Sequence, residues 1–258
     1  MKFPSLNPHY RTALILIVMA GVLISAALLI NRSDFTSAEL IVAGLVCLLT
    51  GVFFTALSGG DDPIDLRYMS LFSAQNCINL ARFCAELGIQ GSASIIPKGK
   101  DGRDQTMQFL PVAVYNGEPL PTGTFVSGPG TAGLLLEPSC TPLLGLLKEQ
   151  EHLHIPADRA ALHGLVRELG VDVLEVAGQA GSMQEGEIIT IILNEYRLIG
   201  GCRVMSAESP RCCIVSPCPV CSLFATVFAE GTGKVIQLER CTPDPKSPMV
   251  TMVFSVLP

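Results

Sequence analysis

Residues 12–30 read TALILIVMAGVLISAALLI and residues 40–57 read LIVAGLVCLLTGVFFTAL, and neither run contains a charged residue. Each run approaches the roughly 20 apolar residues that a helix needs to cross a hydrocarbon core about 30 Å thick. The polar link at 31–39 has room for little more than a tight turn. The two runs therefore predict a transmembrane helical hairpin at 12–58, after a short N-terminal segment at 1–11.

A cleaved signal peptide is one alternative for the first run, because small residues such as Ser25, Ala26 and Ala27 imitate a cleavage site. The run continues to Ile30, however, and exceeds the roughly 7 to 15 residues of a signal core. A second run of membrane length also follows. A helical hairpin buried in a soluble core is the other alternative, and two neighbouring uncharged runs favour the membrane instead.

The basic residues near the ends of the runs predict an orientation. Lys2 and Arg11 precede the first run, Arg32 lies in the link, and Arg67 and Arg82 follow the second run. Because cytoplasmic segments carry the excess of Lys and Arg, we expect a cell-membrane protein with two helices and both termini in the cytoplasm. In that compartment the 10 cysteines would be buried thiols or metal ligands rather than disulfides.

The charge of the remaining chain argues against nucleic acid as a partner. Of the 17 basic and 23 acidic residues, three basic and two acidic ones lie in or before the hairpin, which leaves 14 against 21. A net charge of −7 does not favour binding to nucleic acid, because the negative phosphates attract basic patches. The bilayer, a small apolar ligand, a protein partner or a second copy of the chain remain as expected partners.

The region after the hairpin is predicted to be α+β, with an order of helix, strands, two helices, strands, helix and strands. A Gly- and Pro-containing linker at 59–63 precedes it, and we divide it into subdomains at 62–150 and 151–258, leaving open whether they share a core. Gly170 is expected to end the predicted helix at 156–169. The predicted helices are 66–87, 141–147, 156–169 and 220–230, and the predicted strands are 92–96, 107–114, 123–126, 133–136, 173–177, 187–193, 235–238 and 250–257.

The densest chemical signal is a set of six cysteines near the C-terminus: Cys202, Cys212, Cys213, Cys218, Cys221 and Cys241. Cys218-Pro219-Val220-Cys221 is a Cys-x-x-Cys, whose two thiolates can bind one Zn²⁺ or iron. Zinc usually takes four ligands, so Cys212, Cys213, Cys241 or Glu239 would supply the others. A redox dithiol, an iron–sulfur cluster and a set of unrelated buried thiols are the alternatives.

The C-terminal part contains Pro217-Cys218-Pro219-Val220-Cys221-Ser222-Leu223-Phe224, then Gly231 and Gly233, Glu239-Arg240-Cys241 and the closing Phe254-Ser255-Val256. With these motifs, the segment at about 171–258 resembles the vinyl-reductase-like domains, which are small-molecule-binding modules. The resemblance implies zinc held by Cys218 or Cys221, by Glu239 and by Cys241, whereas Met252 stands where the family often has a last Cys. The layout of a hairpin before such a domain also looks like uncharacterised archaeal membrane proteins.

The chain carries no complete catalytic signature, since Gly-x-Ser-x-Gly, His-Glu-x-x-His and Walker-type motifs are absent from the sequence. We therefore expect a non-catalytic, membrane-tethered sensor or adaptor that binds a small apolar ligand or a partner protein, with a structural zinc. A redox or electron-transfer component using the Cys-x-x-Cys is the second hypothesis. A structural subunit of a membrane complex is the third, because Gly21, Gly44 and Gly51 would allow helices to approach closely.

Overall fold

The computed structural model describes residues 8–30, 35–58, 66–128 and 131–258. The chain divides into two compact units, Met1–Pro63 and Ile64–Pro258. We call them the hairpin and the C-terminal domain. The first seven residues, positions 31–34 of the predicted link and the predicted linker at 59–63 lie outside the described residues.

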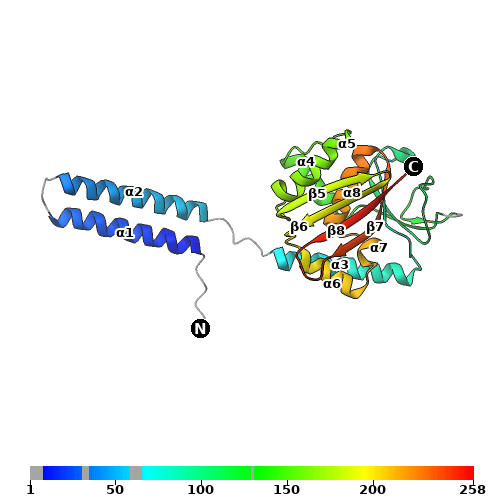
Figure 1. The fold of residues 1–258 in the computed structure, drawn as a ribbon, viewed down its shortest axis with the longest axis horizontal. Coiled ribbons are helices and arrows are strands. Elements are labelled where there is room, and N and C mark those ends of the chain that lie inside the picture. The colour runs from blue at the N-terminus through cyan, green and yellow to red at the C-terminus, as the bar shows by residue number, and fades with distance from the viewer. Residues whose placement is uncertain (1–7, 31–34, 59–65, 129–130) are drawn as a thin grey trace. The chain divides into compact units, whose positions relative to one another are not determined.

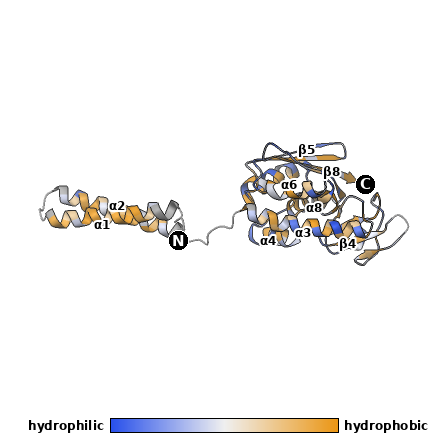
Figure 2. Cartoon of the chain, turned by 90° about the horizontal axis from the view of Figure 1, so that it is seen from below, coloured by the Kyte–Doolittle hydropathy of each residue, from blue (hydrophilic) through white to orange (hydrophobic). Residues whose placement is uncertain are grey.

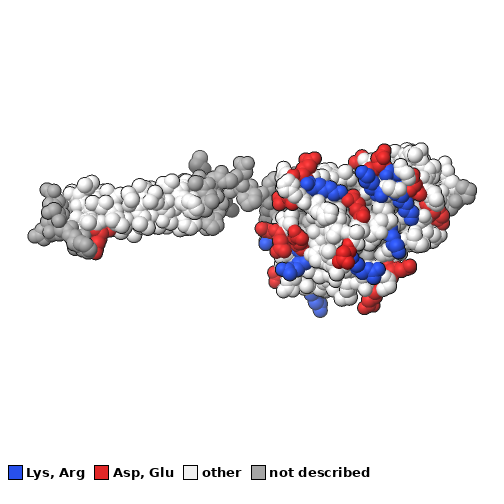
Figure 3. Space-filling model, turned by 90° about the horizontal axis from the view of Figure 1, so that it is seen from above, with Lys and Arg blue, Asp and Glu red and all other residues white. Residues whose placement is uncertain are grey.

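The hairpin consists of helices α1 (Pro8–Ile30) and α2 (Phe35–Ser58), drawn in dark and lighter blue in Figure 1 and mostly hydrophobic in Figure 2. Both helices are long and apolar enough to span a membrane. Only 17% of the Thr12–Leu29 window and 11% of the Ser37–Thr55 window is buried, whereas the core helix of a soluble protein is mostly buried. Figure 3 shows almost no charge on the described part of the hairpin.

Small residues bring α1 and α2 close together. Gly44 and Gly51 have no room for a side chain, because an added Cβ would lie 2.7 Å from Ile24 Cγ1 and 2.8 Å from Ile17 Cγ1 respectively. Gly21 has open space around it, so it takes no part in this contact. The buried small residues recur at intervals of seven on both helices, as expected for two helices in continuous contact: Ala13, Ala20 and Ala27 on α1, and Ser37, Gly44 and Gly51 on α2.

The C-terminal domain is mixed α+β, as predicted. Its first half contains α3 (Leu66–Glu86), β1 (Ser94–Ile96), a short 3-10 turn (Lys100–Gly102), β2 (Met107–Pro111), β3 (Phe125–Val126), β4 (Gly133–Leu136) and α4 (Thr141–Gln150). Its second half contains α5 (Arg159–Arg167), a π-helical turn (Glu168–Val173), β5 (Gln179–Glu185), β6 (Ile188–Asn194), α6 (Ile199–Glu208), α7 (Cys212–Val215), α8 (Pro219–Thr232), β7 (Val235–Pro243) and β8 (Val250–Leu257).

One eight-stranded sheet joins the two predicted subdomains. Its order is β3-β4-β2-β1-β7-β8-β6-β5, and every neighbouring pair is antiparallel. The junction lies between β1 and β7, where Ser94 pairs with Gln237 and Ile95 with Ile236. The residues before and after position 150 thus share one sheet and one compact unit, which answers the question that the sequence left open.

The helices pack on one face of the sheet. Along β8, Val250, Met252, Phe254 and Val256 are buried in the main core, and the residues between them are only partly buried. Helix α8 is the centre of this layer, since all ten residues from 220 to 229 are buried. A helix that is apolar on every side belongs in the interior of a layer, and α8 has that pattern.

Two predicted features of the second half are wrong. The segment 173–177 contains no strand, because a π-helical turn continues α5 through Gly170 to Val173. Gly170 does not end the helix; it lies against β5, where an added Cβ would be 3.1 Å from Ala180 Cβ. Strand β5 itself was missed, as were helices α6 and α7.

Candidate metal centre and apolar cavity

Three buried cysteines from three elements converge beneath the sheet. Cys213 comes from α7, Cys221 from the first turn of α8 and Cys241 from β7. The Sγ of Cys221 lies 3.6 Å from that of Cys213 and 3.6 Å from that of Cys241. All three sulfurs lie within 4.8 Å of one another, so this group could bind a metal ion.

A β-bulge in β7 decides which residues of that strand face the group. Leu238 pairs with Phe254, but Arg240 already pairs with Val253, so Glu239 is an extra residue on its strand. The bulge leaves both Glu239 and Arg240 on the open face and returns Cys241 to the helix-covered face. The carboxylate of Glu239 accepts a hydrogen bond from the Ser255 hydroxyl at 2.6 Å and is exposed. Glu239, a predicted metal ligand, therefore lies away from the three thiols.

Cys218 and Cys202 extend the three cysteines to a group of five, which we call the thiol group. Cys218 is the N-cap of α8, and the neighbouring thiols of Cys202, Cys213 and Cys221 lower the pKa of its own thiol. Cys202, on α6, is the one member of the thiol group that was not among the predicted metal ligands. The thioether of Met252 lies 3.4 Å from the Cys221 sulfur, because Met252 pairs with Cys241 across β7 and β8.

The thiol group is organised as donors and acceptors. Hydrogen bonds to neighbouring sulfurs, together with burial, raise the pKa of Cys202, Cys213 and Cys221. The pKa of Cys218 and that of Cys241 are well below the ordinary thiol value, because the neighbouring thiols donate hydrogen bonds to these two sulfurs. The position of Cys218 at a helix N-terminus also favours a thiolate. Cys218 and Cys241 are therefore the thiols of the group that ionise most readily.

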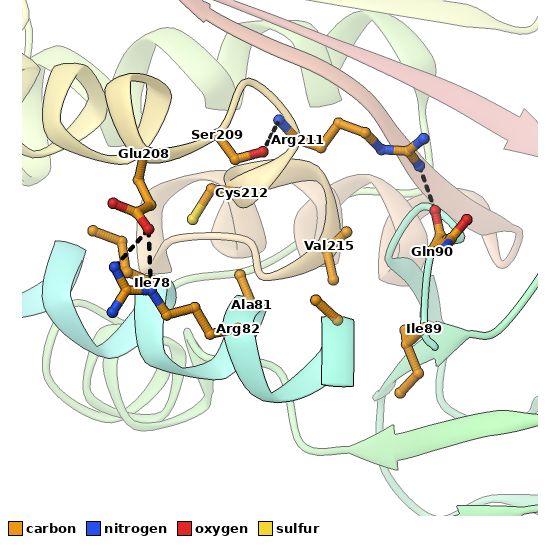
Figure 4. A pocket seen from close by; sticks show the side chains of 11 residues that line it. Ile78, Ala81, Arg82, Ile89, Gln90, Glu208, Ser209, Arg211, Cys212 and Val215 are labelled. Carbon is orange, nitrogen blue, oxygen red and sulfur yellow. Dashed lines mark hydrogen bonds and ion pairs between the residues drawn. The ribbon is translucent and has the colours of Figure 1, made fainter. Parts of the chain in front are cut away.

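Cys212, another predicted ligand, lines a different cavity. This cavity of about 310 Å³ lies between α3 and the helices α6 and α7 (Figure 4). The Arg82 guanidinium donates to the Glu208 carboxylate at 2.6 Å there, and Arg211 donates to the Gln90 carbonyl. Burial raises the pKa of the Cys212 thiol to about 11, so it is neutral at physiological pH.

A second cavity, of about 340 Å³, adjoins the thiol group. Most of its wall is aliphatic and comes from α3, α4, α6 and the segment that follows the π-helical turn. Cys202, Cys218 and the buried Tyr196 also line it. Burial raises the pKa of Tyr196 well above its ordinary value, so its hydroxyl is neutral. We call this space the apolar cavity.

No protein-family model, curated protein or solved structure matches this chain. The resemblance to the vinyl-reductase-like domains is therefore still a prediction. Function has to be argued from the thiol group and the apolar cavity.

Proposed function

We propose that this chain is a membrane-tethered sensor or adaptor. In this proposal the hairpin anchors it in the cell membrane with both termini in the cytoplasm, and the apolar cavity binds a small apolar ligand. A zinc ion at the thiol group staples the elements around that cavity. One observation carries the proposal: Cys202 and Cys218 belong to the thiol group and also line the cavity. A ligand would thus touch the segments that the metal holds.

The sulfur geometry suits a single tetrahedral ion. With zinc–sulfur bonds of about 2.3 Å, the sulfurs of a tetrahedral site lie roughly 3.8 Å apart. The two sulfur–sulfur distances to Cys221 are both 3.6 Å, close to this value. Cys213, Cys221 and Cys241 would supply three ligands, and Cys218, the buried N-cap residue one turn before Cys221, would move toward them to supply the fourth. Such an ion would tie α7, α8 and β7 together.

The apolar cavity sets the class of ligand. Its volume of about 340 Å³ is at the lower end of the range of roughly 300 to 1,000 Å³ that is typical of small-molecule sites. Among the described residues no Lys, Arg, His, Asp or Glu lines it, and its polar groups are the hydroxyls of Ser70, Ser73 and Tyr196 and the thiols of Cys202 and Cys218. A small, uncharged, mainly hydrocarbon molecule with at most one or two hydrogen-bonding groups fits this wall.

A redox role is the second candidate, and the position of Cys218 favours it. Cys218 begins α8 and has a lowered pKa, which is the arrangement of an attacking thiol in a Cys-x-x-Cys motif. The five cysteines are only 2% to 8% exposed, however, and attack on an external disulfide requires access. An iron–sulfur cluster would also have to push the sulfurs apart to make room for its inorganic sulfide.

Metal content of the full chain tests the proposal. The protein is purified in detergent under reductant, together with Cys213→Ser and Cys212→Ser. These neighbours on α7 are both buried, yet only Cys213 belongs to the thiol group. We expect about one zinc per chain in the wild type and in Cys212→Ser, and its loss in Cys213→Ser with a lower midpoint of thermal unfolding.

Other outcomes separate the candidates. Bound iron with visible absorbance would contradict the structural zinc and support an electron-transfer function. A metal-free wild type that forms a disulfide between Cys218 and Cys221 on mild oxidation would support the redox role. Equal zinc content in both variants would mean that the metal binds elsewhere, and the proposed zinc site at the thiol group would be wrong.

A further inference from the structure

The first two turns of α3 carry an unusual amount of exposed apolar surface. Tyr68, Met69, Leu71 and Phe72 are 62%, 47%, 46% and 69% exposed. We call these four residues the α3 patch. Contiguous exposed apolar groups on a folded domain mark a surface that something covers.

The α3 patch ends abruptly along the helix. From Gln75 onward the outward positions are mostly polar, including Asn76, Asn79 and Arg82. Phe83 and Leu87 are 51% and 44% exposed, but Arg82 and Glu86 beside them are exposed and charged. The largest concentration of exposed apolar side chains on α3 is therefore at the end that follows the hairpin in the chain.

Chain length limits what can lie against the α3 patch. Helix α2 ends at Ser58 and α3 begins at Leu66. Seven intervening residues can bridge at most about 28 Å, even when fully extended. If α2 spans a bilayer, the first turn of α3 stays within about 28 Å of the end of α2 and can reach the headgroups. Tyr and other amphipathic aromatic residues prefer this interfacial zone.

We propose that the α3 patch inserts into the surface of the lipid bilayer, so that the apolar cavity opens toward lipid. This inference rests on the membrane anchor of the proposed function and adds the source of the ligand. Met69 belongs to the patch and also lines the cavity, and Leu66 on the preceding turn lines it too. A membrane-dissolved ligand would therefore reach Cys202 and Cys218 without crossing water.

The absence of tryptophan from the chain makes the test direct, because each introduced Trp is the only one. Three variants of the full chain are placed in phosphatidylcholine nanodiscs with and without brominated acyl chains. Phe72→Trp reports on the α3 patch, Phe83→Trp on the polar end of the same helix, and Phe53→Trp on the outer face of α2. All three side chains are more than half exposed, so the larger ring needs no repacking.

We expect brominated lipid to reduce the emission of Phe72→Trp by about twofold, since an interfacial helix buries its apolar face roughly 5 to 10 Å into the acyl boundary. Phe53→Trp should be quenched more strongly, and Phe83→Trp should not change. Far-UV circular dichroism and the thermal midpoint of each variant show that the fold is retained.

The outcomes distinguish this inference from the function on which it rests. If Phe53→Trp is quenched and Phe72→Trp behaves like Phe83→Trp, the anchor stands and the docking of α3 is overturned. If Phe53→Trp is not quenched, the membrane anchor itself fails. If Phe72→Trp is shielded from iodide but not quenched by brominated lipid, protein rather than lipid covers the α3 patch, and the inference is again wrong.

Discussion

Helix α2 and helix α8 are both rich in apolar residues, yet protein covers almost all of α8 and little of α2. All ten residues at 220–229 are buried, whereas 11% of the Ser37–Thr55 window of α2 is buried. Helix α8 is covered by the sheet, by other helices and by the cysteines of the thiol group. Helix α2 contacts its partner helix through a narrow line of small residues and leaves its large residues outward. Two helices of similar apolar composition therefore differ in how much of their surface protein covers. In α8 residues on every side are buried, whereas in α2 mainly the small residues that face α1 are buried.

The largest expected effect comes from removing one phenylalanine from each helix. Phe224 of α8 is fully buried, so Phe224→Ala should lower the free energy of unfolding of the C-terminal domain by about 3 to 5 kcal/mol. Phe53 of α2 is 63% exposed, so Phe53→Ala should leave that free energy unchanged. Chemical denaturation of both variants in the same detergent provides the measurement. Equal losses would mean that the two helices do not differ as described.

The small-residue contact of the hairpin gives the next effect. Gly51→Val would force a side chain against Ile17 and the Ala13 carbonyl, which lie 2.8 and 3.3 Å from the added Cβ. We expect a loss of about 1 to 3 kcal/mol in helix-pair stability, measured by titrating the detergent-solubilised protein with SDS. Gly21→Val is the matched control, because nothing lies within 4 Å of that position. A control as unstable as Gly51→Val would contradict the described packing.

A smaller effect depends on pH at the edge of α8. His163 of α5 lies against Phe228, with ring centroids 5.5 Å apart, and its Nδ1 is 2.7 Å from the Ser182 hydroxyl. Burial, with help from the nearby Arg159, lowers the pKa of His163 below its ordinary value of 6.5. As pH falls through 6.5, the unfolded chain binds this proton before the folded one, so stability decreases.

The matched variant for this pH effect is His163→Gln, which keeps a polar group near Ser182 but cannot titrate. Thermal midpoints are measured between pH 7.5 and pH 5 for both proteins. The decrease on acidification should be smaller in the variant. If the two proteins lose stability in parallel, His163 does not report on the burial of α8.

The smallest effect is expected from the ion pair on the surface of α3 and α6. Arg82 and Glu208 are 2.6 Å apart, but their side chains are 64% and 41% exposed. Because water and salt screen such pairs, Arg82→Ala should change the free energy of unfolding by no more than about 1 kcal/mol. Denaturation at low and high salt measures it. A loss comparable to that of Phe224→Ala would show that surface charge, rather than apolar burial, holds α3 in place.

The parts of the fold with strong periodicity could be predicted from the sequence. Helix α3 was expected at 66–87 and spans Leu66–Glu86, and strand β4 was expected at 133–136, where it lies. Strand β5 could not be found in this way, because Gln179–Glu185 has the sequence QAGSMQE and forms the edge of the sheet, where few apolar side chains are needed. Its pairing with β6, rather than its own residues, makes it a strand.

The candidate site was predictable in residue type and only partly in membership. The density of cysteines pointed to Cys213, Cys218, Cys221 and Cys241, which the structure brings together. It also pointed to Cys212, although adjacent residues on a helix point in different directions, so Cys212 and Cys213 cannot both face one centre. The place of Cys202 in the site could not be predicted, because it depends on helix α6, which the sequence pattern did not reveal. Met252 was noted at the place of a family Cys, but its contact with the Cys221 sulfur follows from the strand register.

The bulge in β7 has a consequence for how insertions and deletions act in this chain. Leu238 and Cys241 face the same side although they are three positions apart, whereas a regular strand would turn them to opposite sides. Removing Glu239 would make the strand regular and still keep the Cys241 sulfur beside Cys221. A strand that normally tolerates no change in length thus has one position where a residue can be gained or lost. Chains with Leu and Cys two positions apart and chains with them three apart can therefore present the same sulfur.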